Sequence, residues 1–399
     1  MNDKRNKQHF GEPKKINTQI KHHILSNTLN TSLAIANNLC KVYKTDKVYT
    51  YIDLFAGRGV FEDYSKGSPL IAIDLLSQHN ESGKNNFNDL QIVCTEKDDK
   101  NYCDLQRLLI EYPDENITCY SGSGEWESFS AQIQSILKDS GWGFIFADPY
   151  STELDIESLK NALQSYSKLK DILVFFNFRT LARQDGRKYI QDIDRICKNI
   201  GINASELLDA DENFSEIFEY KIKEHFKDLK KFVIGVGFPT TVKGQLINSD
   251  YFYLIFSTNT PVLVDAFLDS YEEMLEKYTN YSVNQQMPLF GNPDKNYIFD
   301  VLKTEYSGGC TLYDLYKHIT DKFLSWKELT KTIKKVPTIK NVVSILNEFY
   351  NEGSIKYIAN NDVFYKKNSK HGYEGNLRYS EAGKSADNMK NIRICLNSR

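Results

Sequence analysis

Along the first 280 positions of this chain, segments with the apolar pattern of a strand alternate with segments that have the apolar spacing of a helix. Short runs rich in β-branched and aromatic residues predict buried strands at residues 49–54, 89–95, 117–120, 142–147, 172–178, 232–238 and 251–256. Apolar residues that recur every three or four positions predict helices at residues 18–40, 70–76, 98–112, 127–138, 154–167, 181–200, 214–229 and 262–278. This order predicts an α/β fold with a mostly parallel sheet, closed by a short antiparallel pair of strands around Lys243 and Gly244.

The remainder of the chain has a different pattern. Residues 281–294 are rich in Asn, Gln, Pro and Gly and predict a linker. Helical patterns at 297–306, 312–323, 326–332 and 339–352 then precede two strand-like runs at 354–359 and 362–367. Helices followed by a two-stranded wing favour a winged helix-turn-helix. We therefore expect a basic N-terminal arm (residues 1–17), an α/β domain (18–280), a linker (281–294), a winged-helix-like domain (295–368) and a polar, poorly ordered tail (369–399).

Composition narrows the class of protein. Hydrophobic content is 41% and charged content 26%, as in ordinary globular proteins. No apolar run approaches the roughly 20 residues that span a bilayer, and the polar N-terminus lacks the apolar core of a secretory signal. Seven cysteines are scattered without a Cys-x-x-Cys pair, which argues against a zinc site and a disulfide framework. We expect no metal, no membrane segment and a cytoplasmic location.

Charge is distributed unevenly, although the net charge is only −3. Residues 295–399 contain 18 Lys and Arg against 11 Asp and Glu, a charge of +7, so the preceding chain carries −10. A basic segment on an acidic body indicates an anionic partner, most commonly DNA or RNA. Lys331, Lys334, Lys335 and Lys340 lie near the predicted recognition helix, where phosphate contacts are expected. The alternatives are solvated surface charge and a winged helix that docks a protein.

The run Tyr-Thr-Tyr-Ile-Asp-Leu-Phe-Ala-Gly-Arg-Gly-Val-Phe at residues 49–61 is the strongest chemical signal. Asp53 ends a buried strand, and Gly57 and Gly59 follow in a loop where a ligand can touch the backbone. A dinucleotide-binding fingerprint requires a third glycine where this chain has Glu62. The ligand therefore looks more like S-adenosylmethionine than NAD. The alternative is an ordinary strand-to-loop turn.

Further candidate residues lie around this loop. Glu96 ends the second strand, where an acidic residue accepts hydrogen bonds from the ribose hydroxyls of a nucleotide; it could instead cap the helix that starts near Asp98. Ser68 is the expected N-cap of the next helix, with Pro69 in its first position. Residues 60–67 separate the glycines from that helix, and we expect them to form a lip over the site.

Asp148, Pro149 and Tyr150 follow the fourth strand and are the candidate catalytic residues. This triplet resembles the Asp-Pro-Pro-Tyr signature of enzymes that methylate exocyclic amino groups of bases. In those enzymes the acid accepts from the amino group and the aromatic ring stacks on a flipped-out base. We expect Asp148 to orient the target amine and Tyr150 to stack on it. Alternatively, Asp148 binds cofactor or caps the following helix, and Tyr150 packs in the wall.

Together these residues resemble the three-Cys-motif partner (TcmP) family over residues 15–350. The matching pieces are Lys21 with its helix, the run 51–59, the Gly-Ser-Pro-Leu-Ile-Ala run at 67–72, Glu96, the triplet 148–150, and Asn177 with Phe178. The resemblance implies a Rossmann-like class I methyltransferase fold with a seven-stranded sheet, found in bacterial or phage-linked defence and modification neighbourhoods. It also implies a partner protein that carries the three cysteines, a predicted iron–sulfur radical enzyme. No methyl acceptor is firmly assigned to the family.

The expected S-adenosylmethionine contacts are Asp53, Phe55, Ala56, Gly57, Gly59, Glu96, Lys97 and Ser123. The chain departs from the family pattern at Arg58, where proline or serine is more usual, and at Ser151, where glycine is frequent. Ser123 and Glu125 stand where an aspartate that contacts the adenine amino group would be expected.

Two functions are consistent with these patterns. The first is a methyltransferase that acts on a nucleic acid or nucleobase. The second is a non-catalytic adaptor, in which the methyltransferase fold and the basic C-terminal domain bring a partner enzyme to nucleic acid. In the linker, Gln286 to Phe290 (Gln-Met-Pro-Leu-Phe) resembles the peptide that docks on the bacterial sliding clamp. These residues could instead pin the linker to the protein core.

Overall fold

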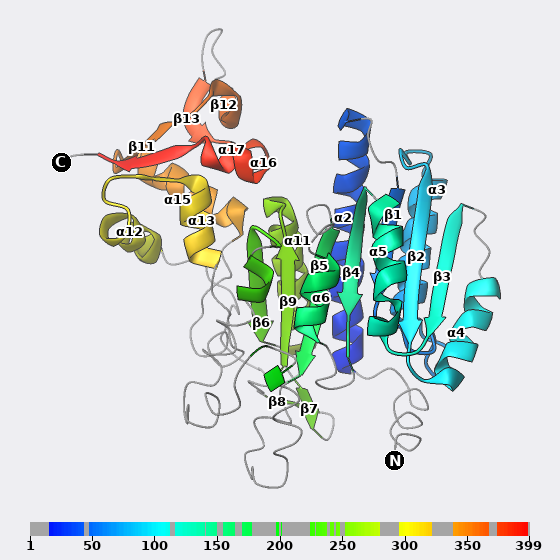
Figure 1. Ribbon diagram of the computed structural model, residues 1–399. Coiled ribbons are helices and arrows are strands. Elements are labelled where there is room, and N and C mark those ends of the chain that lie inside the picture. Colours follow the sequence, from blue (N-terminus) through cyan, green and yellow to red (C-terminus); the bar gives the residue numbers. More distant parts are fainter. Residues whose placement is uncertain are drawn as a thin grey trace. The chain divides into compact units, whose positions relative to one another are not determined.

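The computed structural model separates into two compact units, Met1–Ser257 and Thr258–Arg399 (Figure 1). It describes residues 16–43, 48–111, 116–139, 141–149, 155–163, 170–177, 197–198, 201, 224–227, 229–237, 240–242, 245–247, 252–279, 295–320, 338–366 and 373–397. The predicted linker with its clamp-like motif, most of the helices predicted at 181–200 and 214–229, and Tyr150 lie outside these residues. Helix α11 (Pro261–Thr279), which we expected to end the first domain, belongs to the second unit.

A seven-stranded sheet forms the centre of the first unit, which confirms the predicted α/β class. Its strand order is β3-β2-β1-β4-β5-β9-β6. The pairs β1–β2, β1–β4, β2–β3 and β4–β5 are parallel, whereas β9 runs antiparallel to β5, as expected for a methyltransferase core. The strands are β1 (Val48–Asp53), β2 (Asp89–Glu96), β3 (Ile117–Ser123), β4 (Trp142–Ala147), β5 (Lys170–Asn177), β6 (Phe232–Gly237) and β9 (Phe252–Thr258). Next to the predicted turn, β7 (Thr240–Val242) and β8 (Gln245–Ile247) form a separate antiparallel pair.

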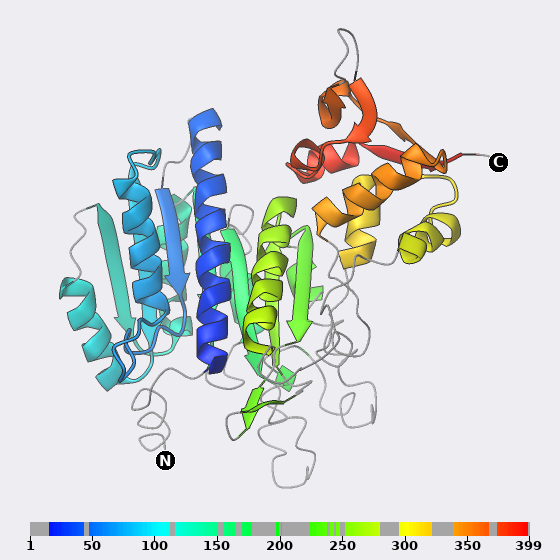
Figure 2. The same ribbon diagram turned by 180° about the vertical axis from the view of Figure 1, so that it is seen from behind.

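Helices cover both faces of this sheet. Figures 1 and 2 show α2 (Ile16–Tyr43) and α3 (Ser68–Glu81) on one face, and α5 (Ser130–Asp139) and α6 (Ile156–Leu163) on the other. Helix α4 (Asp99–Glu111) packs against β2 and β3, and a 3-10 turn, η1 (Trp126–Phe129), precedes α5. The helical spacing that predicts α2 corresponds to its core-facing stripe, whose buried residues are Ile20, Ile24, Leu25, Leu29, Leu33 and Ala36.

Helix α2 is held against the sheet by polar contacts as well. Ser32 Oγ donates to Asp171 Oδ2 at 2.7 Å and accepts from the Tyr49 hydroxyl at 3.1 Å. Tyr49 and Asp171 stand near the first residues of β1 and β5, so α2 is tied to the amino edge of the sheet. Residue 21 lies three helical turns before Ser32, about 16 Å along the axis. Lys21 is thereby carried to the carboxyl edge.

The second unit differs from its prediction in strand pairing. We expected β11 (Ile355–Ile358) and β12 (Phe364–Lys366) to form a hairpin. Instead, β11 pairs with β14 (Arg393–Leu396), and β12 pairs with β13 (Tyr373–Leu377). β14 also pairs with β10 (Cys310–Thr311), so a strand of the predicted tail is the centre of a three-stranded sheet. The helices are α11, α12 (Lys295–Thr304), α13 (Leu312–Thr320), α15 (Ile339–Asn351), α16 (Tyr379–Ala382), α17 (Ala386–Lys390) and the 3-10 turn η4 (Asn361–Val363).

The expectation of a poorly ordered tail was therefore wrong. Several of its apolar side chains are almost completely buried, among them Leu377, Met389, Ile392 and Ile394. They are separated by polar residues, which is why the tail reads as polar by composition.

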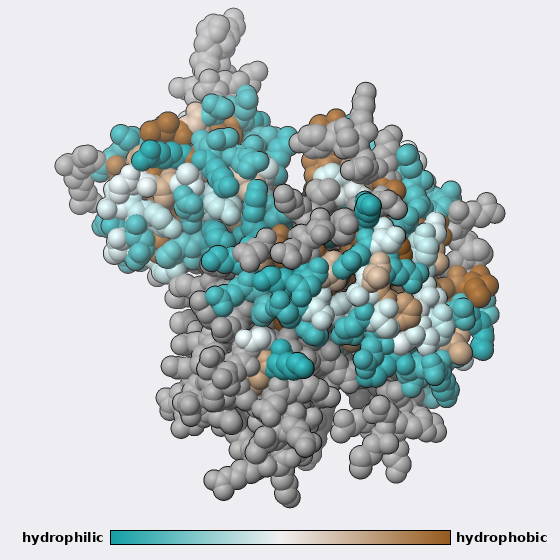
Figure 3. Space-filling model, viewed as in Figure 1, coloured by the Kyte–Doolittle hydropathy of each residue, from teal (hydrophilic) through white to brown (hydrophobic). Residues whose placement is uncertain are grey.

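The face shown in Figure 3 is mostly hydrophilic, with small scattered apolar groups. Within the described parts of both units, every helix is too short or too polar to cross a membrane.

Candidate functional site

The strand order places a topological switch point between β1 and β4. From β1 the chain continues to β2 and β3 on one side, and later returns to β4 and β5 on the other. Ligands of open α/β sheets bind outside the carboxyl ends of the strands at such a point. Three of the predicted acids stand at this edge: Asp53 ends β1, Glu96 ends β2 and Asp148 directly follows β4. The carboxyl ends of β4 and β5 point downward in Figure 1.

Asp53 is a fully buried carboxylate. Its Oδ1 accepts from the Phe55 amide at 3.2 Å and its Oδ2 from the Tyr51 hydroxyl at 3.1 Å; Ser68 also hydrogen-bonds to it. Burial raises its pKa to about 7, because desolvation outweighs these hydrogen bonds, and the charge of Asp148 adds to the shift. Asp53 therefore organises the start of the loop from inside the protein.

Ser68 does not have the predicted role of N-cap. The N-cap of α3 is Gly67, so Pro69 is the second residue of the helix and not the first as predicted. Ser68 is itself the first helical residue, and its hydroxyl bonds to Asp53. A long-range carboxylate partner therefore replaces the local cap that the sequence pattern suggests.

The loop after β1 requires its glycines. Gly57 and Gly59 have φ of 64° and 82°, in the left-handed region that favours glycine. The Gly67 amide donates to the Gly59 carbonyl at 2.7 Å, and a Cβ at Gly67 would lie 2.8 Å from that oxygen. The backbone is thus folded tightly here, with little side chain between it and a ligand.

The expected lip is a closed hairpin-like turn. An antiparallel bridge joins Val60 to Lys66, and the Phe61 amide donates to the Ser65 carbonyl at 3.0 Å. Phe61 is buried with its ring centroid 6.0 Å from that of His22 in α2, whereas Tyr64 at the tip is 90% exposed. The turn is therefore attached to α2 and presents an aromatic side chain to solvent.

Glu96 connects the glycine loop to the tip of β2. Its Oε2 accepts from the Gly57 amide at 2.8 Å, and its Oε1 accepts from the Asp98 amide at 2.8 Å. Desolvation raises the pKa of this buried carboxyl group. Asp98 in turn caps α4 through the Asn101 amide. The Asn101 side chain is a third partner of Glu96. A carboxylate has about four lone-pair sites, so about one remains available for a ligand hydroxyl.

Lys97 and Ser123 lie on the outer side of this edge. The Lys97 ammonium is 2.7 Å from Glu125, and both side chains are largely exposed. The exposed Ser123 hydroxyl donates to Asp99 at 2.7 Å. These two predicted cofactor contacts thus stand at the ends of β2 and β3, near Glu96, whose carbonyl accepts from the Gly124 amide. Phe55 and Ala56 lie between Asp53 and Gly57, and the Ala56 amide donates to the Thr95 carbonyl at 3.0 Å.

Asp148 has a partner that the sequence did not reveal. The Lys21 ammonium of α2 donates to Asp148 Oδ2, and the two side chains are 10% and 19% exposed. The same ammonium lies 4.3 Å from the centroid of the Phe175 ring in β5. Pro149 is buried. In the sequence, Lys21 stands out only as part of the family resemblance, and its partner is 127 residues away.

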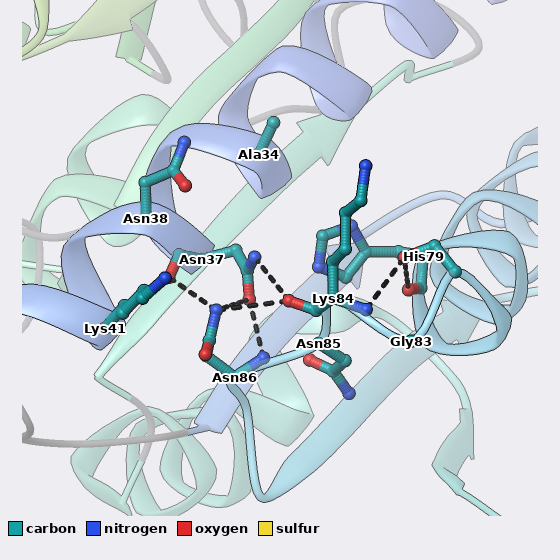
Figure 4. Close-up of a pocket in the computed structure, with 10 residues that line it drawn as sticks. Ala34, Asn37, Asn38, Lys41, His79, Gly83, Lys84, Asn85 and Asn86 are labelled. Atoms are coloured by element: carbon teal, nitrogen blue, oxygen red, sulfur yellow. Dashed lines mark hydrogen bonds between the residues drawn. The ribbon is translucent and has the colours of Figure 1, made fainter.

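A polar recess of about 560 Å³ lies elsewhere, between α2 and the loop that leads into β2 (Figure 4). Its lining includes Asn37, Lys41, His79, Lys84 and Asn86, and Asn37 ties the loop down through the Lys84 carbonyl and the Asn86 amide. It is at the amino edge of the sheet and contains none of the predicted site residues. In the described parts of the chain, no group of three or more His, Cys, Asp or Glu could hold a metal ion.

Comparison with known proteins gives low similarity. No family model matches the chain, and no curated protein matches it; the resemblance to the TcmP family thus remains a prediction. Among solved structures, WbdD aligns at 9% identity with a TM-score of 0.33, over 64% of this chain and 43% of WbdD. Human methyltransferase-like protein 13, in complex with SAH, aligns at 10% identity with a TM-score of 0.30, over 68% of this chain and 96% of that protein. The B. subtilis tRNA methyltransferase TrmK aligns at 10% identity with a TM-score of 0.22, over 79% of this chain and 95% of TrmK. The chain thus spans less than half of WbdD.

Proposed function

We propose that this protein is an S-adenosylmethionine-dependent methyltransferase. The observation that carries the proposal is the hydrogen bond from the Gly57 amide to Glu96. It joins the glycine loop to an acidic residue at the end of the second strand, where ribose-binding acids lie in such sheets. In this proposal the methionine part of the cofactor lies along Gly57 and Gly59. The remaining acceptor site of Glu96 accepts from the ribose hydroxyls, and the methyl group faces Asp148.

The chain's own residues would mainly position the reactants. S-adenosylmethionine, when bound, supplies an activated methyl group on a sulfonium. Methyl transfer then needs an acceptor held in line at near-attack distance, which is chiefly an orientation effect. Asp148 Oδ2 is taken by Lys21, whereas no other described residue donates to this side chain. Oδ1 can therefore accept from the amino group of an acceptor.

We propose a nucleobase amino group as the acceptor, with Tyr150 stacking on the base and Pro149 fixing the chain between the two. The second unit would then supply nucleic-acid binding as a winged-helix-like module, with Lys340 at the start of α15 among its cations. The ammonium of Lys340 lies 6.0 Å from the Tyr379 ring centroid. A three-Cys-motif partner enzyme, a sliding-clamp contact through Gln286 to Phe290, and a role in phage defence or nucleic-acid modification are further proposals from the sequence.

Calorimetric titration with S-adenosylmethionine and S-adenosylhomocysteine tests the cofactor. Gly59→Ala should weaken both by at least about tenfold, because its Cβ would lie 3.1 Å from Leu108 and its φ of 82° strains a side chain. Gly83→Ala is the matched control: it imposes similar strain at φ 66°, has no neighbour within 4 Å and lies at the opposite edge. It should keep wild-type affinity. The absence of both heat and a thermal shift with the wild-type protein would refute the proposal and favour the adaptor.

A further inference from the structure

The ion pair between Lys21 and Asp148 lies where the methyl group would be transferred. Asp148 follows β4, one of the two strands at the switch point, and Lys21 reaches it from α2. Both side chains are mostly buried. Breaking a buried pair by removal of one partner leaves an uncompensated charge in a region of low dielectric. The state of this pair therefore sets the local charge at this edge.

A second carboxylate makes the compensation important. Asp53 ends the neighbouring strand β1, and the charge of Asp148 disfavours its ionised form. Without Lys21, its positive charge would no longer compensate the two neighbouring acids at this buried edge. The Phe175 ring lies against the Lys21 ammonium and favours a cation at this position. Ser32 and Asp171 fix α2 to the sheet, which gives the lysine a defined point of entry.

We propose that Lys21 is a positioning residue of the methyl-transfer site, which neutralises Asp148 beside the sulfonium and holds its Oδ2 so that Oδ1 faces the acceptor. This inference rests on the proposed function. The positive charge of a sulfonium is dispersed as the methyl group leaves. A bare carboxylate nearby would stabilise the bound cofactor more than the transition state, and such ground-state binding does not accelerate transfer. Lys21 removes that effect while it keeps the carboxylate oriented.

The two cofactor forms provide a test that needs no methyl acceptor. S-adenosylmethionine carries the sulfonium charge and S-adenosylhomocysteine does not, so the ratio of their affinities reports local charge. Lys21→Met should increase the preference for S-adenosylmethionine by at least about tenfold, because the uncompensated charge of Asp148 would then act on the sulfonium at an effective dielectric near about 20. Lys21→Arg should keep the wild-type ratio, and Lys21→Met combined with Asp148→Asn should return toward it.

A merely structural role would weaken both ligands together and leave the ratio unchanged in Lys21→Met, which would overturn the inference. If Lys21→Met does not fold, Asp148→Asn alone decides, since it leaves Lys21 uncompensated. It should lower the preference for the sulfonium form by about tenfold, and an unchanged ratio would again refute the role. Failure of the proposed function is a different result, namely that neither ligand binds the wild-type protein.

Discussion

Glu96 Oε2 accepts a hydrogen bond from the Gly57 amide at 2.8 Å, so one carboxylate fixes the glycine loop after β1 to the tip of β2. The contact joins residues 39 positions apart. It means that the conformation of the loop is fixed by a contact within the protein. In the proposed function Glu96 also contacts the ligand, so its substitution should affect binding more strongly than stability.

Glu96→Gln tests this dual role. The amide retains one carbonyl acceptor but loses the charge and the second acceptor. We expect the affinity for S-adenosylmethionine to fall more than about tenfold, with a loss of about 1–3 kcal/mol in the free energy of unfolding. Calorimetry and urea denaturation measure the two effects. Glu81→Gln, at an exposed position at the end of α3, is the control and should change neither. Wild-type affinity in Glu96→Gln would exclude Glu96 as a ribose ligand.

The buried Asp53 predicts a dependence of stability on pH. Its folded-state pKa of about 7 lies above its ordinary value of 3.8, so the folded protein holds this proton more tightly than the unfolded chain. The contribution is fully present below about pH 4 and is lost as the pH rises through 7. At most it is on the order of 4 kcal/mol. Asp53→Asn has no such titration, so wild type should lose stability relative to Asp53→Asn between pH 4 and 7 in denaturant melts. A constant difference over that range would contradict the raised pKa.

Much of the first unit could be predicted because its signals are local. Buried strands and the apolar stripe of α2 are patterns within a few residues, and parallel strands necessarily end at one edge. For that reason Asp53, Glu96 and Asp148 could be placed at a common edge from the sequence alone. Their proposed roles in cofactor binding and catalysis remain predictions.

The parts that could not be predicted depend on partners far apart in the chain. Lys21 and Asp148 have no pattern that links them, and Ser68 has a carboxylate partner where its sequence context suggests a cap. In the second unit, β11 and β12 are adjacent in sequence, which favours a hairpin. The structure instead pairs β11 with β14, because the apolar residues of the last 30 positions complete the core of that unit. The only sign of this in the sequence was the isolated apolar run around Ile392 and Ile394.

The close approach of Gly67 to Gly59 predicts a steric effect without backbone strain. Gly67 has φ of −78°, which any residue can adopt, but an added Cβ would lie 2.8 Å from the Gly59 carbonyl oxygen. Gly67→Ala should therefore cost roughly 1–3 kcal/mol in the free energy of unfolding and weaken cofactor binding as the loop moves. Gly308→Ala, where nothing lies within 4 Å, should change both by little. Equal effects of the two substitutions would show that the loop tolerates displacement.

Asp265 in α11 organises the helices of the second unit. Its Oδ1 accepts from the Tyr316 hydroxyl of α13 at 2.8 Å and from the Ile339 amide of α15 at 2.7 Å. Burial raises its pKa to about 7. Asp265→Ala leaves two buried donors without an acceptor, so we expect a loss of roughly 2–4 kcal/mol in the free energy of unfolding of this unit.

Tyr316→Phe removes only one of these hydrogen bonds and should cost about 1 kcal/mol while leaving the Ile339 contact in place. Asp300→Asn, at an exposed position on α12, is the matched control and should be neutral. Hydrogen exchange of the α15 amides separates the outcomes: Asp265→Ala should increase exchange at Ile339 and its neighbours, because the first turn loses its carboxylate acceptor. If protection in α15 is unchanged while global stability falls, Asp265 stabilises the unit through packing and not through these hydrogen bonds.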